Sequence, residues 1–301
     1  MIPNLIILLG VIVMVIFSTL AERKVMGSCQ KRLGPNTVGY LGTLQALADG
    51  VKLIIKETII PSYSQNVLFI LSPFYFFGIS LLNWLIIPLD NGLTISEING
   101  TGIIITVALS EMSILGILYA GYSSNSKYSL LGTLRAIAQC ISYGITMSLG
   151  FICIILFVGS VDYLDILNSQ SSTPLIYALL PVGIILLISF VAELGRPPFD
   201  LLESESELVA GHMSEYAGVT FAFFFLAEYS MMLFYGVLLT VLLFGFSNPV
   251  PFLFFLIWIR ASLPRIRIDS LINLNWSHFL PFLTGYLIFL IPLILVTLLN
   301  Y

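Results

Sequence analysis

Charged side chains are scarce in this chain. Of its 301 residues, 12 are Lys or Arg and 16 are Asp or Glu, which makes 9% charged, against ~25% in soluble domains. A water-soluble protein of this size needs far more polar surface than these side chains provide. A soluble enzyme, a nucleic-acid-binding protein and a disordered chain are therefore excluded. Because 58% of the residues are hydrophobic, we expect the solvent of most of the chain to be lipid.

Patterns that bind metals or redox cofactors are also missing. The three cysteines lie far apart, at Cys29, Cys140 and Cys153, and give neither a CxxC pair nor a disulfide framework. His212 and His278 cannot form a paired haem site on one helix, and there is no dinucleotide-binding glycine motif. A di-metal carboxylate site needs paired ExxH motifs, and only His212 with Glu215 approaches one, in reversed order. The sequence predicts no metal, no cofactor and no catalytic redox residue in this chain, so electrons would have to come from a partner.

Long apolar stretches predict an all-α membrane protein with eight transmembrane helices, because about 20 apolar residues span a bilayer as a helix. The stretches are Ile2–Leu20, Val67–Leu89, Gly102–Tyr122, Ile137–Val158, Pro174–Ala192, Val219–Phe246, Val250–Leu271 and Leu280–Leu299. The seventh is the weakest, since Arg260, Pro264 and Arg265 interrupt it.

The placement of the basic residues favours eight spans over seven. All 12 Lys and Arg fall in or beside odd-numbered connections, and omitting the seventh span would move the last basic cluster to the opposite face. The positive-inside rule therefore predicts eight spans with both termini on the outer side. We expect one integral membrane domain, residues 1–301, with inner loops at about 22–66, 123–136, 193–218 and 260–279.

The first inner loop contains an amphipathic pattern. Its apolar residues recur at helical spacing, at Leu41, Leu44, Ala48, Val51 and Ile55. The opposite face carries Gln45, Asp49, Lys52 and Lys56. This pattern predicts a helix in the membrane interface; a surface helix that closes the bundle is the alternative.

The third inner connection is the most densely charged segment. Its acids are Glu193, Asp200, Glu203, Glu205, Glu207 and Glu215, and its one basic residue is Arg196. Pro197-Pro198 cannot continue a helix, so the fifth span is predicted to end near Gly195. Carboxylates crowded beside a low-dielectric bundle can exchange protons near neutral pH; a solvated acidic loop is the alternative.

Two further acids lie within predicted spans, Glu111 in the third and Glu228 in the sixth. An intramembrane carboxylate costs ~2.5–3.5 kcal/mol on insertion scales and is a functional hypothesis by default. A packing role through a hydrogen bond to a neighbouring helix is the alternative.

Several segments, in order along residues 21–270, resemble one family. They are Ala21-Glu22-Arg23-Lys24-Val25-Met26-Gly27, Arg32-Leu33-Gly34-Pro35-Asn36, Leu47-Ala48-Asp49-Gly50-Val51-Lys52, Lys56-Glu57, Ser124-Asn125-Ser126-Lys127-Tyr128, Leu134-Arg135-Ala136, Ala192-Glu193-Leu194-Gly195-Arg196-Pro197-Pro198-Phe199-Asp200-Leu201, Glu203-Ser204-Glu205-Ser206-Glu207-Leu208-Val209, Glu215-Tyr216, Ala227-Glu228-Tyr229 and Trp258-Ile259-Arg260-Ala261-Ser262-Leu263-Pro264-Arg265. Together they resemble subunit 1 of proton-pumping NADH:ubiquinone oxidoreductase, respiratory complex I.

The resemblance implies a subunit that forms much of the ubiquinone tunnel and couples quinone reduction to proton translocation. Ubiquinone is then the substrate. The implied tunnel and interface residues are Arg23, Arg32, Asp49, Lys52, Arg196, Phe221 and Arg260. The implied proton-coupling acids are Glu193, Asp200, Glu203, Glu205, Glu207, Glu215 and Glu228, and Glu111 joins them as an intramembrane carboxylate.

The resemblance also implies partners and a location. The partners are matrix-side subunits that carry the terminal iron–sulfur cluster, small membrane subunits beside the antiporter-like ones, and membrane lipids. No basic residue precedes Arg23, so neither a secretory signal nor a transit peptide is predicted. The missing targeting signals and the composition together favour synthesis inside a mitochondrion from the mitochondrial genome. The protein is then expected in the mitochondrial inner membrane.

Two alternatives lie outside complex I. A subunit of a membrane-bound hydrogenase or plastid-type dehydrogenase would share the loops and differ in electron donor. A secondary transporter is disfavoured, because the inverted repeats typical of that class are missing.

One position departs from the family pattern. After Ile141-Ser142-Tyr143 the family commonly has a membrane glutamate, and this chain has Gly144. We expect that Glu111, on the preceding helix, supplies the carboxylate instead. That expectation requires Glu111 to lie beside residue 144 and not on a lipid face away from it.

Overall fold

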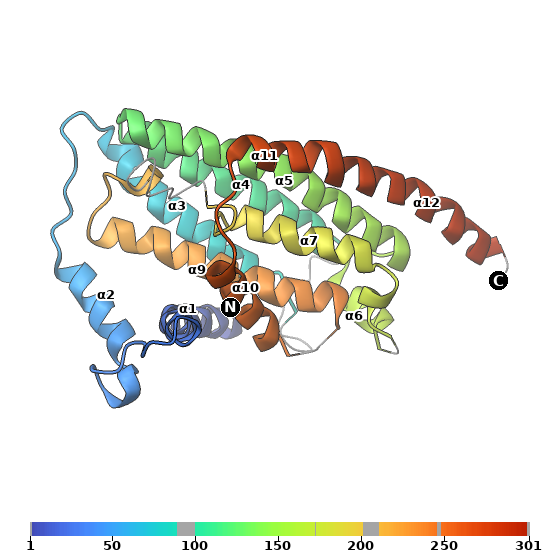
Figure 1. Ribbon diagram of the computed structural model, residues 1–301, viewed down its shortest axis with the longest axis horizontal. Coiled ribbons are helices and arrows are strands. Elements are labelled where there is room, and N and C mark those ends of the chain that lie inside the picture. The colour runs from blue at the N-terminus through green and yellow to red at the C-terminus, as the bar shows by residue number, and fades with distance from the viewer. Residues whose placement is uncertain (1, 89–99, 172, 201–210, 246–247, 300–301) are drawn as a thin grey trace.

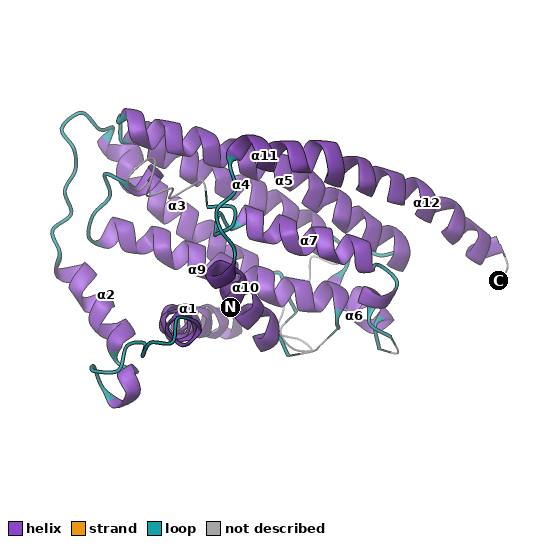
Figure 2. Ribbon diagram, viewed as in Figure 1, coloured by secondary structure: helices purple, strands orange, loops and turns teal. Residues whose placement is uncertain are grey.

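Helices make up the regular structure of this chain. The computed structural model describes residues 2–88, 100–171, 173–200, 211–245 and 248–299. Within these ranges every regular element is a helix (Figures 1 and 2). The all-α prediction is confirmed for this part of the chain.

The helices fall into long and short ones. The long ones are α1 (Ile2–Cys29), α3 (Asn66–Trp84), α4 (Gly102–Ser123), α5 (Lys127–Val158), α9 (Val219–Leu243) and α12 (Leu280–Leu299). The shorter ones are α2 (Gln45–Ile55), α6 (Tyr163–Ser169), α7 (Leu180–Glu193), α10 (Val250–Ser262) and α11 (Ile268–Leu274). Single turns occur at η1 (Tyr40–Gly42), η2 (Leu175–Tyr177), η3 (Gly211–Met213) and the π-helical η4 (Asn275–Phe279).

Five of the described helical stretches are long and apolar enough to cross a membrane. They are α3, α4, α5, α9 and the continuous run Ile268–Leu293. The helices α7 and α10 are equally apolar but shorter. Such helices define an integral membrane protein, because only a helix satisfies its own backbone hydrogen bonds in lipid.

The central helix of the bundle is α9, which packs against α1, α3 and α10. Figure 1 shows α3, α4, α5, α7 and α9 running side by side, with α2 set apart at one end. Small residues let neighbouring helices approach closely. At Gly150 of α5, an added Cβ would lie 2.5 Å from Leu186 Cδ2 of α7, so a larger residue here would push the Leu186 side chain aside.

Hydrogen bonds join several of the connections between helices at the two ends of the bundle. At one end, the Asn125 amide donates to the Tyr63 carbonyl and the Ser129 hydroxyl to the His212 carbonyl. These contacts join the first, second and third inner connections. At the other end, the Gly100 N–H donates to Asp162 and the Gln170 amide to the Val241 carbonyl.

Several helix limits differ from the expectation, and α1 continues past the predicted end at Leu20 to Cys29. The predicted span Val250–Leu271 is not one helix: α10 ends at Ser262, and α11 begins at Ile268 and continues through η4 into α12. Pro264 explains the break, because proline has no N–H to donate and forces the preceding Leu263 into an extended conformation. The fifth span is also shorter, since η2 precedes α7 and α7 starts at Leu180.

Another difference concerns the amphipathic segment. The helix α2 begins at Gln45, because Leu41 adopts a left-handed φ of 54° and lies outside it. The prediction for the end of the fifth span is confirmed, since α7 ends at Glu193 and Gly195 takes a positive φ before the proline pair. Residues 127–136, expected in the second inner loop, form the first turns of α5, which Ser126 caps by accepting from Ser129 N.

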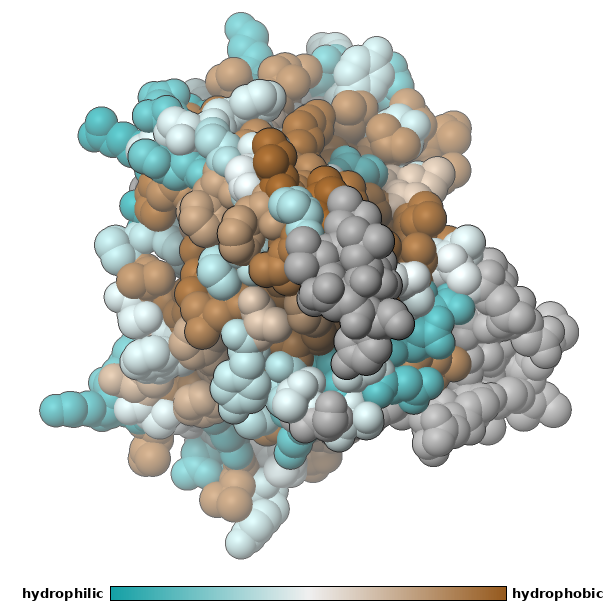
Figure 3. Space-filling model, turned by 90° about the vertical axis from the view of Figure 1, so that its right-hand side faces the viewer, coloured by the Kyte–Doolittle hydropathy of each residue, from teal (hydrophilic) through white to brown (hydrophobic). Residues whose placement is uncertain are grey.

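The surface is largely apolar. Figure 3 shows brown side chains across the middle of one end of the molecule, with hydrophilic side chains towards its edges. Exposed apolar residues also follow the outward sides of α4 and α5, among them Ile104, Leu115, Ile141 and Ile145. Apolar patches of this kind mark contact with lipid or with other proteins.

Candidate functional site: an ion-pair cluster beside a carboxylate pocket

A buried carboxylate holds two arginines together. Glu22, near the end of α1, is only 3% exposed and accepts a hydrogen bond from Arg196 Nη1 at 2.9 Å. Its other oxygen accepts from Arg260 of α10. The cluster therefore joins α1, the segment after α7 and α10. Removing one partner of a buried ion pair typically costs about 3–5 kcal/mol, because the remaining charge is left uncompensated.

Arg196 is held on two further sides. Its guanidinium lies over the ring of Tyr229 of α9, 4.3 Å from the ring centroid, a cation–π geometry. Its Nη1 also donates to Met232 Sδ at 3.2 Å. Burial opposes the charge of Arg196, but Glu22, Tyr229 and Glu228 together outweigh burial and raise the pKa of the guanidinium. Arg196 therefore stays charged inside the bundle.

A second ion pair lies on the same segment. Asp200 Oδ2 accepts from Arg265 Nη2 at 2.6 Å, with the Asp200 side chain 9% exposed. This pair ties the segment after α7 to the extended residues between α10 and α11. Both ion pairs thus connect residues around position 200 with the basic segment near position 260.

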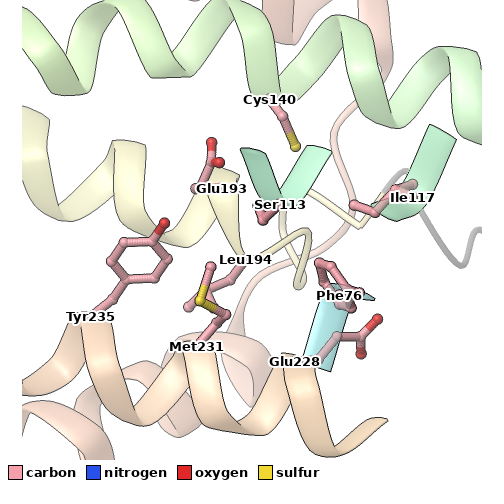
Figure 4. Close-up of a pocket in the computed structure, with 9 residues that line it drawn as sticks. All are labelled: Phe76, Ser113, Ile117, Cys140, Glu193, Leu194, Glu228, Met231 and Tyr235. Atoms are coloured by element: carbon pink, nitrogen blue, oxygen red, sulfur yellow. The ribbon is translucent and has the colours of Figure 1, made fainter. Parts of the chain in front are cut away.

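A small pocket lies between the apolar helices next to this cluster. It is lined by Phe76, Ser113, Ile117, Cys140, Glu193, Leu194, Glu228, Met231 and Tyr235, from α3, α4, α5, α7, α9 and Leu194 just after α7 (Figure 4). Glu193 and Glu228 lie on different sides of it. The Oε2 atom of Glu193 and the Tyr235 hydroxyl are shielded from solvent and have no hydrogen-bond partner among the described residues. A buried hydroxyl or carboxylate without a protein partner needs an ordered water as its hydrogen-bond partner, and the carboxylate can also take up a proton.

The predicted tunnel residues near α2 are more exposed. Arg23 donates to Asp49 Oδ2 at 2.5 Å, and Gln45 donates to Asp49 Oδ1 at 3.0 Å. Arg32 donates to Gln30 at 2.7 Å on the surface, and Lys52 lies exposed on α2. An exposed ion pair contributes about 0–1 kcal/mol, so these contacts position the segment more than they stabilise it.

The remaining predicted residues are spread over the chain. Phe221 packs against Phe225, with ring centroids 4.5 Å apart. Glu215 is exposed before α9, and Glu111 is exposed on α4 with its carboxylate against Gly144. Glu203, Glu205 and Glu207 lie outside the described residues.

Glu22 and Tyr229 were not among the predicted site residues. A single acid beside the basic first loop, Glu22 next to Arg23, is the signal that points to an ion pair, but the sequence cannot say which arginines it meets.

Over the described part of the chain, no three His, Cys, Asp or Glu side chains are arranged to hold a metal ion. The expectation that the chain binds no redox cofactor stays a prediction.

Apolar helices that enclose arginines and carboxylates define a helical membrane protein with a charged interior. A sequence model described as NADH dehydrogenase matches residues 2–291. The chain is 45% identical over 284 residues to NADH-ubiquinone oxidoreductase chain 1 of Hyaloraphidium curvatum, covering 94% of this chain and 95% of the relative. It is 44% identical to the protein of the same name in Yarrowia lipolytica, covering 97% and 96%.

A bacterial relative gives the same result. The corresponding NADH-quinone oxidoreductase subunit of Rickettsia prowazekii is 42% identical over 298 residues, covering 92% of this chain and 88% of the relative. The chain belongs to the NADH dehydrogenase family, whose members here are the chain 1 component of NADH:quinone oxidoreductase and its bacterial counterpart. It is therefore a core membrane subunit of that respiratory enzyme complex, and the predicted resemblance is confirmed.

Proposed function

We propose that this chain forms much of the ubiquinone tunnel and couples quinone reduction to proton translocation. One observation carries the proposal: a line of charged side chains runs from the Glu22 cluster into the membrane-embedded pocket. Arg196 links the two, because it pairs with Glu22 and interacts electrostatically with Glu228. Glu193, three residues before Arg196, lines the same pocket as Glu228.

A quinone needs a site that opens to lipid and offers polar groups to its head. On α2 the apolar side chains of Leu47, Val51 and Ile55 are all more than half exposed. The basic rim of Arg23 and Lys24 lies beside them, since Arg23 pairs with Asp49 and Lys24 donates to the Leu41 carbonyl. We place the tunnel entrance here, with α2 in the membrane interface. The proposed tunnel set is Arg23, Arg32, Asp49, Lys52, Arg196, Phe221 and Arg260.

Reduction of the quinone takes up two protons and changes the charge beside the arginines. The carboxylates of the pocket respond to that change, because charges interact strongly where the dielectric constant is low. The proposed coupling set is Glu111, Glu193, Asp200, Glu203, Glu205, Glu207, Glu215 and Glu228. These residues transmit the charge change and perform no redox chemistry themselves.

The proposed setting follows the sequence expectations. The chain forms one membrane domain that spans the mitochondrial inner membrane eight times. Its basic loops lie on the inner side and both termini on the outer side. It is encoded in the mitochondrial genome. It binds no cofactor of its own. It contacts the matrix-side subunits that carry the terminal iron–sulfur cluster and the small membrane subunits.

The test replaces Glu193 and Glu228 with glutamine, singly and together, in the assembled complex. Glutamine keeps the shape and removes the exchangeable charge. NADH-driven quinone reduction and proton translocation are expected to fall by roughly tenfold or more in the double variant, about 1.4 kcal/mol or more in the barrier. Oxidation of NADH by a water-soluble electron acceptor is expected to stay unchanged.

The matched control is Asp165→Asn, an exposed acid of α6 at the opposite end of the bundle. It is expected to behave like the parent. Coupled turnover at the parental rate in the double variant, with normal assembly, would refute the proposed coupling role.

A further inference from the structure

A buried glutamine of α5 joins two points of the segment that carries Arg196. Gln139 has no exposed surface, and its Nε2 donates to the Ala192 carbonyl at 2.6 Å and to the Phe199 carbonyl at 2.9 Å. A carbonyl oxygen can only accept, so the nitrogen of the amide must face both partners. The two carbonyls therefore lie close together, and residues 192–199 form a loop that Gln139 closes at its base.

Two turns make up this loop, which we call the Arg196 loop. The Gly195 N–H donates to the Ala192 carbonyl at 3.1 Å, at the end of α7, and the Phe199 N–H donates to the Arg196 carbonyl at 2.8 Å. Residues 197 and 198 are prolines and have no N–H to donate. The Gln139 amide bridges the start of the first turn and the end of the second.

The oxygen of the same amide shows that Gln139 is more than a packing residue. Gln139 Oε1 is shielded from solvent and accepts no hydrogen bond within the described part of the chain. An unsatisfied buried acceptor costs free energy, which an apolar side chain of the same size would avoid. The two bonds that its nitrogen donates are therefore what Gln139 contributes to the bundle.

Two proposed functional residues lie on the Arg196 loop. Glu193 lines the pocket, and Arg196 forms the buried ion pair with Glu22. Cys140, directly after Gln139 in the chain, also lines this pocket (Figure 4). The support is firm, because α5 packs along α7. Without the Gln139 bonds, the base of the loop would be free to open, and Arg196 would shift from its acceptor.

We propose that Gln139 is a positioning residue for quinone binding, which holds Arg196 in place by closing the base of its loop. Gln139 acts through the backbone of the loop and not by touching the quinone. The inference rests on the proposed tunnel role of Arg196 and adds the residue on which the placement of Arg196 depends.

The first experiment replaces Gln139 with methionine in the assembled complex. Methionine is also unbranched and of similar length, but it cannot donate either hydrogen bond. The apparent KM for quinone should rise by roughly fivefold or more, while kcat changes by less than about twofold, as expected when substrate binding is weakened. Oxidation of NADH by a water-soluble electron acceptor should stay unchanged.

Gln170→Met is the matched control. Gln170 is also a buried glutamine whose amide donates to backbone carbonyls, those of Val241 and Leu242 at the end of α9, at 2.9 and 3.3 Å. Both variants should lower the midpoint of thermal disassembly, whereas only Gln139→Met should raise the KM. A parental KM in Gln139→Met, or an equal rise in the two variants, would overturn the inference.

A milder variant covers the case in which Gln139→Met does not assemble. Gln139→Asn keeps the amide on a side chain that is one carbon shorter, so its nitrogen cannot reach both carbonyls at the present distances. Its KM should lie above that of the parent and below that of any assembled Gln139→Met. Assembly of Gln139→Asn with a parental KM would count against the inference.

A double variant tests whether Gln139 acts through Arg196. Gln139→Met combined with Arg196→Lys should have the KM of Arg196→Lys alone within about twofold, because two residues that act as one unit are not additive. Effects that multiply would show independent roles and overturn the inference. A parental KM in Arg196→Lys would instead remove the proposed tunnel role itself. A raised KM in Arg196→Lys with a parental KM in Gln139→Met would overturn this inference alone.

Discussion

Glu22 and Arg196 are 174 residues apart in the chain and form a hydrogen-bonded ion pair at 2.9 Å inside the bundle. The pair fixes the segment after α7 against α1, and Arg260 joins it from α10. Three segments that carry the family motifs are thereby held at one place. A buried ion pair seldom adds net stability compared with an apolar core, but it imposes one arrangement on the groups around it.

Replacement of Glu22 by alanine is expected to destabilise the assembled complex. Two arginines then lose their shared acceptor, and an uncompensated buried charge costs about 3–5 kcal/mol. A lower midpoint of thermal disassembly and less assembled complex should follow. Asp49→Ala removes the exposed partner of Arg23 and should cost no more than about 1 kcal/mol. Equal loss in the two variants would contradict the buried role of Glu22.

Arg196→Lys tests the geometry around the guanidinium. Lysine keeps the charge but cannot stack flat on Tyr229 or make the same directed hydrogen bonds. We expect the complex to assemble and its apparent KM for quinone to rise by roughly tenfold, about 1.4 kcal/mol of lost binding. Steady-state kinetics with a range of quinone concentrations measures this. An unchanged KM and kcat would show that charge alone suffices at this position.

Gly144→Ala tests the contact between Glu111 and Gly144 with the smallest possible side chain. The added Cβ overlaps Glu111 Oε1, so the flexible Glu111 side chain has to move aside, at a cost of about 1 kcal/mol, the lower end of the range for overpacking. Gly78→Ala in α3 is the control, because an added Cβ there meets no atom within 4 Å. Alanine at Gly78 should be neutral or stabilise the helix by about 1 kcal/mol. Thermal stability of both assembled variants distinguishes the cases; two equal results would argue against the contact.

A charge on the apolar side of α2 is expected to block entry of the quinone tail. Val51→Asp puts a carboxylate among Leu47 and Ile55 at the proposed entrance. Reduction of a long-tailed quinone should fall by roughly fivefold or more, since inserting a charge into the interface is costly, while a short-tailed water-soluble quinone is affected less. Thr43→Asp, on exposed backbone before α2, is the control. Equal effects on both quinones would place the entrance elsewhere.

Much of the fold follows from hydropathy and charge placement. The helices α3, α4 and α9 begin within a few residues of their predicted starts. The helix α5 begins at Lys127, ten residues before its predicted start. Hydrogen bonds also join the first, second and third inner connections to one another. The helix limits after residue 249 are harder to predict, because hydropathy alone does not distinguish one continuous helix from two helices separated at a proline. Only the conformation around Pro264 decides that α10 stops and α11 begins.

The site was predicted less completely than the fold. Glu193 was expected to be functional because it belongs to a crowded acidic connection, and Glu228 because a charge inside an apolar span is costly. Both line one pocket. Glu22 and Tyr229 were missed, since the sequence signals at most an ion pair at Glu22 and nothing at Tyr229, and it names no partner for either. Their importance lies in what they touch, and Arg196 reaches both from a distant part of the chain.

The sequence by itself determined that this protein is helical and that several of its helices are long and apolar enough to cross a membrane, because hydrophobic length acts locally along the chain. Tertiary structure alone decided which arginines share Glu22, which carboxylates meet in the pocket, and that Glu111 fills the space beside Gly144. These relationships depend on how helices cross, and helix packing is set by the summed fit of many side chains from distant segments, which no local pattern records.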